Sequence, residues 1–171
     1  MSADLSGEAR PVQVPAEIIG FLSDAIVGVA GTRNADLAPR VHRISGWRVE
    51  ADRETMACMF PEQFTPHLLE SLEQNGQFTV TIERIPSHET YQFKGEFLSA
   101  KPCTADDIEV CNRIRDKFGT TVPMFVPVSE AAARAFCIPP SLTIRFRVRE
   151  IYTQTPGPGA GRRIVPSEEP R

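Results

Sequence analysis

The sequence predicts a mainly β fold with helices, of the α+β class, in which six mostly antiparallel strands close into a barrel. About six segments are rich in β-branched or aromatic residues, and several connections between them are short. Helical segments are inserted between groups of strands rather than after every strand, which disfavours a doubly wound parallel sheet. Closure into a barrel would remove the exposed edges that such strands otherwise leave.

The N-terminal part of the chain predicts one short helix followed by strands. Residues 15–24 read as a helix because Ile18, Ile19 and Leu22 fall on one side of it. Short apolar and β-branched runs then alternate with turn residues such as Asn and Asp. Strands are expected at residues 25–33, 37–51 and 55–60.

The clearest helix of the sequence lies at residues 65–76. Thr65 is expected to cap its first turn, and Gly76 suits its exit. The next run, residues 77–85, alternates apolar and polar side chains and predicts a strand. This strand is expected to form a hairpin with a strand at residues 90–98 across a short turn.

The stretch TYQFKG, which begins at Thr90, places Thr90, Gln92 and Lys94 on one strand face and apolar residues on the other. This polar face either meets solvent or lines a site. Farther along, Thr104 heads a pattern typical of a capping box at the start of a helix. The remaining elements are expected as helices at residues 104–119 and 129–136 and a strand at residues 142–152.

Length and composition predict one cytoplasmic domain. The 171 residues are enough to bury a core, and the 41% hydrophobic and 24% charged fractions are ordinary for a globular protein. A net charge of −3 argues against a nucleic-acid partner. No apolar run reaches the length of a membrane span, and the four cysteines are widely spaced, as in a chain with reduced thiols. The expected division is a mobile N-terminus at 1–14, a domain at 15–152, and a Pro/Gly-rich tail at 153–171.

The segment PRVHRISGW, residues 39–47, concentrates hydrogen-bond donors on a strand. Arg40 and His42 share one face, whereas Arg43 lies on the other. The segment is interpreted either as a solvated strand edge or as a site for an anionic ligand, since guanidinium groups bind phosphate in a bidentate manner. No metal-ligand spacing, phosphate loop or supported catalytic Cys–His pair is found.

Several segments together resemble the pyridoxamine 5'-phosphate oxidase-like flavin-binding split barrels. They are AIVGVAGTR, PRVHRISGWRVE, PHLLESLEQNGQFTVTI, HETYQFKGEF and TQTPGPGAG, in the order and spacing of that family. The resemblance covers roughly residues 15–161. It implies a six-stranded antiparallel split β-barrel of Greek-key type, a bound FMN, and a homodimer with the flavin site at its interface.

The resemblance also implies which residues contact the flavin. They belong to the second strand, the end of the third strand, the start of the middle helix and the strand after Ser87. The matching positions are Arg40, Val41, His42, Arg43 and Ser45; Met59 and Phe60; Thr65 and His67; and Thr90 or Gln92.

One departure from the family concerns the flavin phosphate. The oxidase carries an Arg-Lys pair at the start of the middle helix, where this chain has His67 and Leu68. Thr65, the helix N-terminus and Arg40 or Arg43 are the expected substitutes. Pyridoxamine phosphate oxidation is therefore disfavoured. A flavin-dependent oxidoreductase acting on a small organic substrate is expected, with an F420-dependent reductase or a non-catalytic flavin- or haem-binding module as alternatives.

Overall fold

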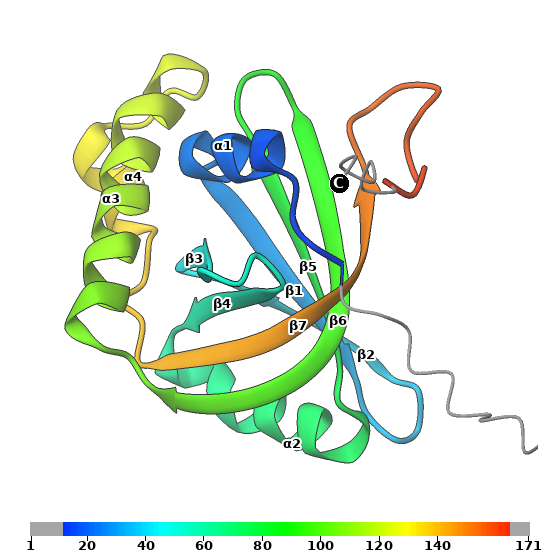
Figure 1. The fold of residues 1–171 in the computed structure, drawn as a ribbon. Coiled ribbons are helices and arrows are strands. Elements are labelled where there is room, and N and C mark those ends of the chain that lie inside the picture. The colour runs from blue at the N-terminus through cyan, green and yellow to red at the C-terminus, as the bar shows by residue number, and fades with distance from the viewer. Residues whose placement is uncertain (1–11, 165–171) are drawn as a thin grey trace, which may run out of the picture.

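The computed structural model describes residues 12–164. Its main feature is one seven-stranded sheet, with every neighbouring pair antiparallel, in the order β2-β1-β5-β6-β7-β4-β3. The sheet curls into an open barrel, with two helices at its ends and two at its side (Figure 1). The predicted mainly β barrel is thereby confirmed, with one strand more than expected.

The bounds of the elements agree closely with the sequence-based expectations. The strands are β1 Val27–Arg33, β2 Pro39–Arg43, β3 Gly46–Val49, β4 Thr55–Phe60, β5 Gln77–Arg84, β6 Glu89–Pro102 and β7 Leu142–Thr153. The helices are α1 Ala16–Asp24, α2 Thr65–Asn75, α3 Ala105–Thr121 and α4 Glu130–Ala135, with short 3-10 turns η1 Glu62–Phe64 and η2 Val122–Met124.

The extra strand arises because the segment expected as one strand at 37–51 is two. β2 pairs with β1, and β3 pairs with β4 at the opposite edge of the sheet. The crossing is held by two backbone bonds, from Ile44 N to the Gly28 oxygen at 3.2 Å and from Ser45 N to the Met59 oxygen at 2.8 Å. This one segment therefore draws the two edges of the sheet together.

The barrel interior is filled by the inward-facing residues of the strands. Phe78 lies at its centre, with its ring centroid 5.0 Å from that of Phe146 and 6.1 Å from that of Phe60. α1 covers one end of the barrel and α2 the other (Figure 1). At the first end, the Trp47 indole donates a hydrogen bond to the Leu22 oxygen at 3.1 Å, which ties α1 to β3.

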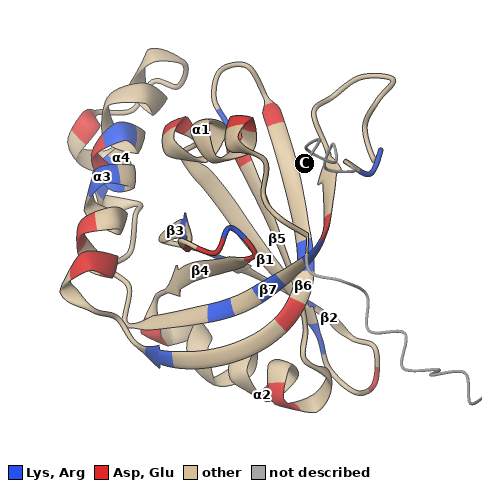
Figure 2. Cartoon of the chain, viewed as in Figure 1, with Lys and Arg blue, Asp and Glu red and all other residues tan. Residues whose placement is uncertain are grey.

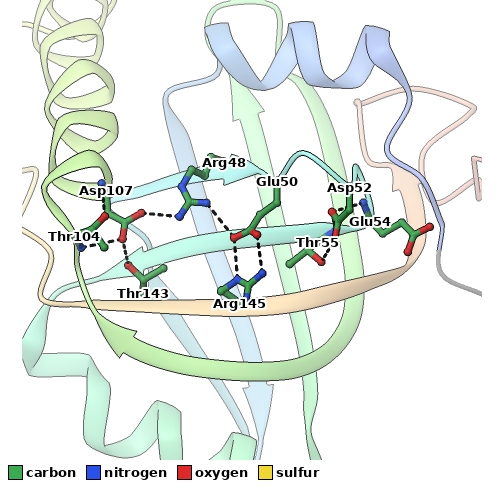
Figure 3. Close-up of polar contacts among 9 residues, drawn as sticks. All are labelled: Arg48, Glu50, Asp52, Glu54, Thr55, Thr104, Asp107, Thr143 and Arg145. Atoms are coloured by element: carbon green, nitrogen blue, oxygen red, sulfur yellow. Dashed lines mark hydrogen bonds and ion pairs between the residues drawn. The ribbon is translucent and has the colours of Figure 1, made fainter.

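A chain of ion pairs fixes α3 and β7 to the β3–β4 hairpin (Figure 3). Arg48 contacts Glu50 at 3.1 Å and Asp107 at 3.0 Å, and Arg145 grips both Glu50 oxygens at 2.8 and 2.6 Å. The hydrogen bonds from Arg145 hold the pKa of Glu50 below its usual range, although burial opposes this. The arginines of β7 are thus engaged in structure, since Arg147 and Arg149 also pair with glutamates.

Both ends of the described chain pack on the barrel. Val14 is fully buried and its N–H bonds the Arg53 oxygen at 2.7 Å, so residues 12–14 pack on the barrel. Residues 1–11 of the segment expected to be mobile lie outside the described part. The tail folds back, with Ile164 N bonding the Ile151 oxygen at 2.7 Å. Its last seven residues lie outside the described part. None of the described helices has the length and apolar character needed to cross a bilayer.

Candidate functional site

A partly polar surface runs across the outside of the barrel. Residues directly opposite each other on paired strands share a face. Gln92 lies opposite Thr81 on β5 and Tyr152 on β7, and Lys94 lies opposite Thr79. The pairings of β1 carry the same face on to β2. We name this surface the outer sheet face; it comprises Val29, Val41, Thr79, Thr81, Gln92, Lys94 and Tyr152.

Side-chain contacts on the outer sheet face orient its polar groups. Gln92 Nε2 donates to Thr81 Oγ1 at 3.3 Å, and Gln154 Nε2 donates to Gln92 Oε1 at 3.4 Å. The Lys94 ammonium lies 4.6 Å from the centroid of the Tyr152 ring, within cation–π range. The polar side of β6 therefore faces outward, and the Gln92 amide is held in a defined direction.

Of the two candidate residues on β6, only Gln92 remains well placed to meet a ligand. Thr90 is covered by the chain after β7, since its N–H bonds Thr155 Oγ1 at 3.0 Å and Gln154 N bonds its oxygen at 2.7 Å. The Thr90 hydroxyl itself donates a hydrogen bond to the His88 oxygen at 2.9 Å.

A second group of polar residues lies where β2 meets α2. We name it the β2–α2 cluster; it comprises Thr32, Arg40, His42, His67 and Glu70. Arg40 contacts the Glu70 carboxylate at 3.4 Å, and His67 Nδ1 lies 3.7 Å from the same oxygen. The register places Arg40 opposite Thr32 and His42 opposite Ala30. Arg40 and His67 therefore meet at a single exposed carboxylate, and His42 lies beside Phe64, with its ring centroid 5.9 Å from that of Phe64.

His42 is the unusual member of this cluster. Its side chain is 7% exposed, and Nε2 has no hydrogen-bond partner among the described residues. Burial lowers the pKa of His42 below 6.5, and the charges of Arg40 and His67 lower it further. The neighbouring Thr32 hydroxyl is also buried without a partner there. Buried polar groups are normally paired, so these two atoms indicate a ligand or water at this position.

The N-terminus of α2 lies in the same region. The helix begins at Thr65, its N-cap is Phe64, and no side chain caps it. The expectation that Thr65 caps the helix is therefore wrong, because its hydroxyl donates to the Glu62 oxygen at 2.8 Å. The turn η1 runs directly into α2, so the Thr65 N–H already bonds the Glu62 oxygen, and Pro66 has no N–H. The helix start therefore favours an anion mainly through its dipole.

Arg43 lies opposite Val29 of the outer sheet face, but Arg43 and Ser45 both bind the segment after α4. The Arg43 guanidinium lies 3.8 Å from the centroid of the Phe136 ring and donates to the Phe136 oxygen at 3.0 Å. Ser45 Oγ donates to the Ile138 oxygen at 2.8 Å. Both side chains therefore anchor the segment after α4 and are not gathered with Arg40.

Met59 and Phe60 are fully buried on β4, so their side chains reach neither the outer sheet face nor the β2–α2 cluster. The structure thus groups Arg40, His42, Thr65 and His67 around α2, and it places Val41 and Gln92 on the outer sheet face. All four cysteines are free, and the residues at 12–164 hold no group of three or more acidic, His or Cys side chains arranged for a metal.

Sequence reasoning missed Thr32, Glu70, Thr81 and Tyr152. The strict alternation of residues 77–85 could have identified Thr81 as an outward neighbour of Gln92. Nothing local marks Thr32 or Glu70, because they join the site only through the packing of β1 and α2 beside β2.

Comparison with known proteins identifies the fold. No protein-family model and no curated protein matches the chain. Among solved structures, HupZ of Group A Streptococcus superposes with a TM-score of 0.54 at 15% identity, covering 87% of this chain and 100% of that one. An F420 reductase gives a TM-score of 0.51 at 12% identity, covering 81% and 98%.

A third similar structure is described as a candidate pyridoxamine 5'-phosphate oxidase from Lactobacillus delbrueckii. It superposes with a TM-score of 0.50 at 11% identity and covers 82% of this chain and 93% of that one. At such identities the likeness concerns the fold. The chain therefore has the split-barrel fold of the pyridoxamine 5'-phosphate oxidase-like proteins, as its sequence resemblance predicted.

Proposed function

We propose that this protein binds one FMN per chain without a covalent link and acts as a flavin-dependent oxidoreductase on a small organic substrate. The observation that carries the proposal is the β2–α2 cluster. It combines Arg40, two histidines and the start of α2 with two buried polar atoms that have no partner among residues 12–164. Structures with the same fold include one described as an F420 reductase.

The cluster suits the terminal phosphate of a flavin nucleotide. Arg40 supplies a guanidinium charge, and the positive end of the α2 dipole lies beside it. Glu70 competes for Arg40 and His67, but its side chain is 53% exposed and its ion pairs are correspondingly weak. A phosphate dianion can replace this carboxylate, and the unpartnered His42 Nε2 and Thr32 hydroxyl can then bond it.

The outer sheet face suits the flavin ring. Val41 points to this face, whereas Arg40 and His42 point to the opposite one, so a flavin that contacts both regions would pass around the edge strand β2. The oriented Gln92 amide and the Thr81 hydroxyl offer hydrogen bonds to polar ring atoms. The bound flavin would supply hydride or electron transfer. The residues of the chain would hold the ring and tune it by these hydrogen bonds.

A homodimer through the outer sheet face is part of the proposal. Val41 is 73% exposed and Val29 is 40% exposed on this face. Val29 lies opposite Arg43, which stacks on Phe136, and Phe136 is 63% exposed. These exposed apolar side chains on a partly polar face favour burial by a second copy, and twofold dimers are the commonest way to achieve it.

Absorption spectra and reconstitution test the cofactor. The purified protein, or the protein incubated with excess FMN and passed through gel filtration, is expected to carry one flavin per chain with an ordinary two-band flavin spectrum. Parallel incubations with F420 and haem serve as comparisons. Failure to retain FMN, or retention of F420 or haem in its place, would refute the assignment.

A further inference from the structure

A cleft of about 380 Å³ opens between α1 and α3, over the edge strand β3. This volume lies within the range of small-molecule sites in proteins. Most of its wall is apolar. The apolar lining residues are Ile19, Leu22, Trp47, Val49, Val110 and Ile114. The cleft lies on the α3 side of the molecule, and none of its lining residues belongs to the β2–α2 cluster or to the outer sheet face.

The sequence of α3 builds one wall of this cleft with a mixed character. Val110, Arg113, Ile114 and Lys117 recur at the spacing of one helix face, so apolar and basic side chains alternate along the same wall. The acidic residues of α3 lie mainly at its N-terminal end, and the basic ones farther along (Figure 2). The face that turns to α1 is therefore apolar with a basic rim.

Among the described residues, three cations and no carboxylate line the cleft, and each of these cations pairs with a carboxylate outside the lining. Arg48 is fixed by Glu50 and Asp107, whereas Lys117 reaches across to the Ser23 oxygen at 2.6 Å and to Asp24 at 2.9 Å. Of the three cations, Arg113 has the weakest ion pair.

Arg113 pairs with Glu109 one turn earlier on α3, and both side chains are at least 65% exposed. An exposed pair of this kind is weak and readily exchanges one carboxylate for another. Arg113 is therefore the cation best able to take a new anionic partner, and Lys117 stands one turn beyond it.

We propose that this cleft binds a small amphipathic carboxylate, with an apolar chain or ring against Trp47, Val49 and Ile114 and its carboxylate on Arg113. The proposal rests on the charge complementarity of the rim and on the apolar wall, and it is independent of the flavin site. A cationic ligand of the same length would meet like charges at the rim, and a neutral one would gain no ion pair.

Tryptophan fluorescence can report binding at this site. Trp47 is the single tryptophan of the sequence, and it lines the cleft with its indole N–H already bonded to Leu22. Titration of the purified protein with octanoate at millimolar concentration is expected to change the Trp47 emission saturably. Octanol should bind about 3- to 10-fold more weakly and octylammonium more weakly still, because neither gains the charge-assisted bond to Arg113.

Variants locate the binding. Arg113→Gln is expected to weaken octanoate binding about 3- to 10-fold. A higher salt concentration should also weaken octanoate binding to the wild-type protein. Val110→Phe should weaken binding by filling the cleft. The control Lys101→Gln, on the exposed end of β6, should leave it unchanged.

Calorimetry on the same samples supplies a second readout for binding. No saturable signal by either method, equal binding of octanoate and octylammonium, or unchanged octanoate affinity in both Arg113→Gln and Val110→Phe would each overturn the proposal.

Discussion

Arg40 and Arg43 stand three positions apart on one strand and serve different parts of the molecule. Their spacing predicts opposite faces, and the structure confirms it: Arg40 turns to Glu70 on α2, whereas Arg43 turns to Phe136 after α4. The sequence could not show that Arg43 is held between aromatic rings, because Phe118 and Phe136 come from a distant part of the chain.

Replacement of Arg43 by alanine should affect stability more than flavin binding. The variant loses a cation–π contact and a hydrogen bond to a backbone oxygen, so the free energy of unfolding should fall by about 1–2 kcal/mol. Urea unfolding measures this, with the exposed Arg113→Ala as the control. If Arg43→Ala instead weakened FMN binding as much as Arg40→Ala, the phosphate would have to lie near α4.

His42 should make the stability of the flavin-free protein depend on pH. Because burial lowers its pKa below 6.5 in the folded state, the unfolded chain binds a proton that the folded chain does not. The free energy of unfolding should therefore decrease as pH falls below about 6.5, until the lowered folded pKa is reached.

In the variant His42→Gln, the free energy of unfolding should depend less on pH below about 6.5. Urea unfolding of both proteins between about pH 5 and pH 8 gives the comparison. Equal slopes for the two proteins below pH 6.5 would contradict the role given to His42.

At the scale of elements, Asp107 is the residue that fixes α3 to the barrel. It closes a capping box with Thr104, accepts a hydrogen bond from Thr143 at 2.9 Å and pairs with Arg48 (Figure 3). Burial raises the pKa of Asp107, but these hydrogen bonds together with Arg48 outweigh it and leave the pKa below the usual value.

Asp107→Ala should therefore lower the free energy of unfolding by about 2–4 kcal/mol, because it removes the acceptor for the Thr104 N–H and the Thr143 hydroxyl and leaves Arg48 without its buried partner. The neighbouring exposed Asp106→Ala is the matched control and should change it by less than about 1 kcal/mol. A similar small loss for both variants in urea unfolding would show that α3 is held by apolar packing instead.

Element types were predictable from local patterns, whereas their partners were not. The alternation of residues 77–85 and the Thr104 capping pattern are both realised in the structure. The division of 37–51 into β2 and β3 was missed, because it depends on which sheet edge each half meets.

Strand β6 shows the same limit. It was expected to end at Leu98 but continues to Pro102, past the irregularity at Gly95. A Cβ at this glycine would lie 2.0 Å from the Arg147 oxygen, so Gly95 permits close approach to β7 and does not end the strand. Only the position of β7 reveals this.

The candidate site was predictable to a similar degree. The donors of β2 and the start of α2 could be identified from residue type and order, and the structure brings Arg40 and His67 to the same carboxylate. Met59 and Phe60 could not be judged, because both faces of β4 are buried and this depends on how distant parts of the chain pack against it.

At the scale of the whole molecule, the outer sheet face should mediate a homodimer. Light scattering is expected to give about twice the chain mass of 18.9 kDa. Val41→Asp should shift the protein to a monomer, because it places a charge in the interface. The fold of the single chain should tolerate it, since Val41 is exposed there. Ile108→Asp, on the exposed side of α3, is the control. A wild-type protein that is monomeric when loaded with flavin would contradict this arrangement.

The central claim is that the β2–α2 cluster holds the phosphate of a flavin nucleotide. The most direct test compares FMN and riboflavin, which differ only by that phosphate, in fluorescence titrations of the wild type and of Arg40→Ala. We predict that Arg40→Ala weakens FMN binding by about 10- to 150-fold, the loss expected for one charge-assisted pair, and changes riboflavin binding by less than about 3-fold. Equal effects on the two ligands, or no effect on either, would contradict the claim that Arg40 binds the phosphate.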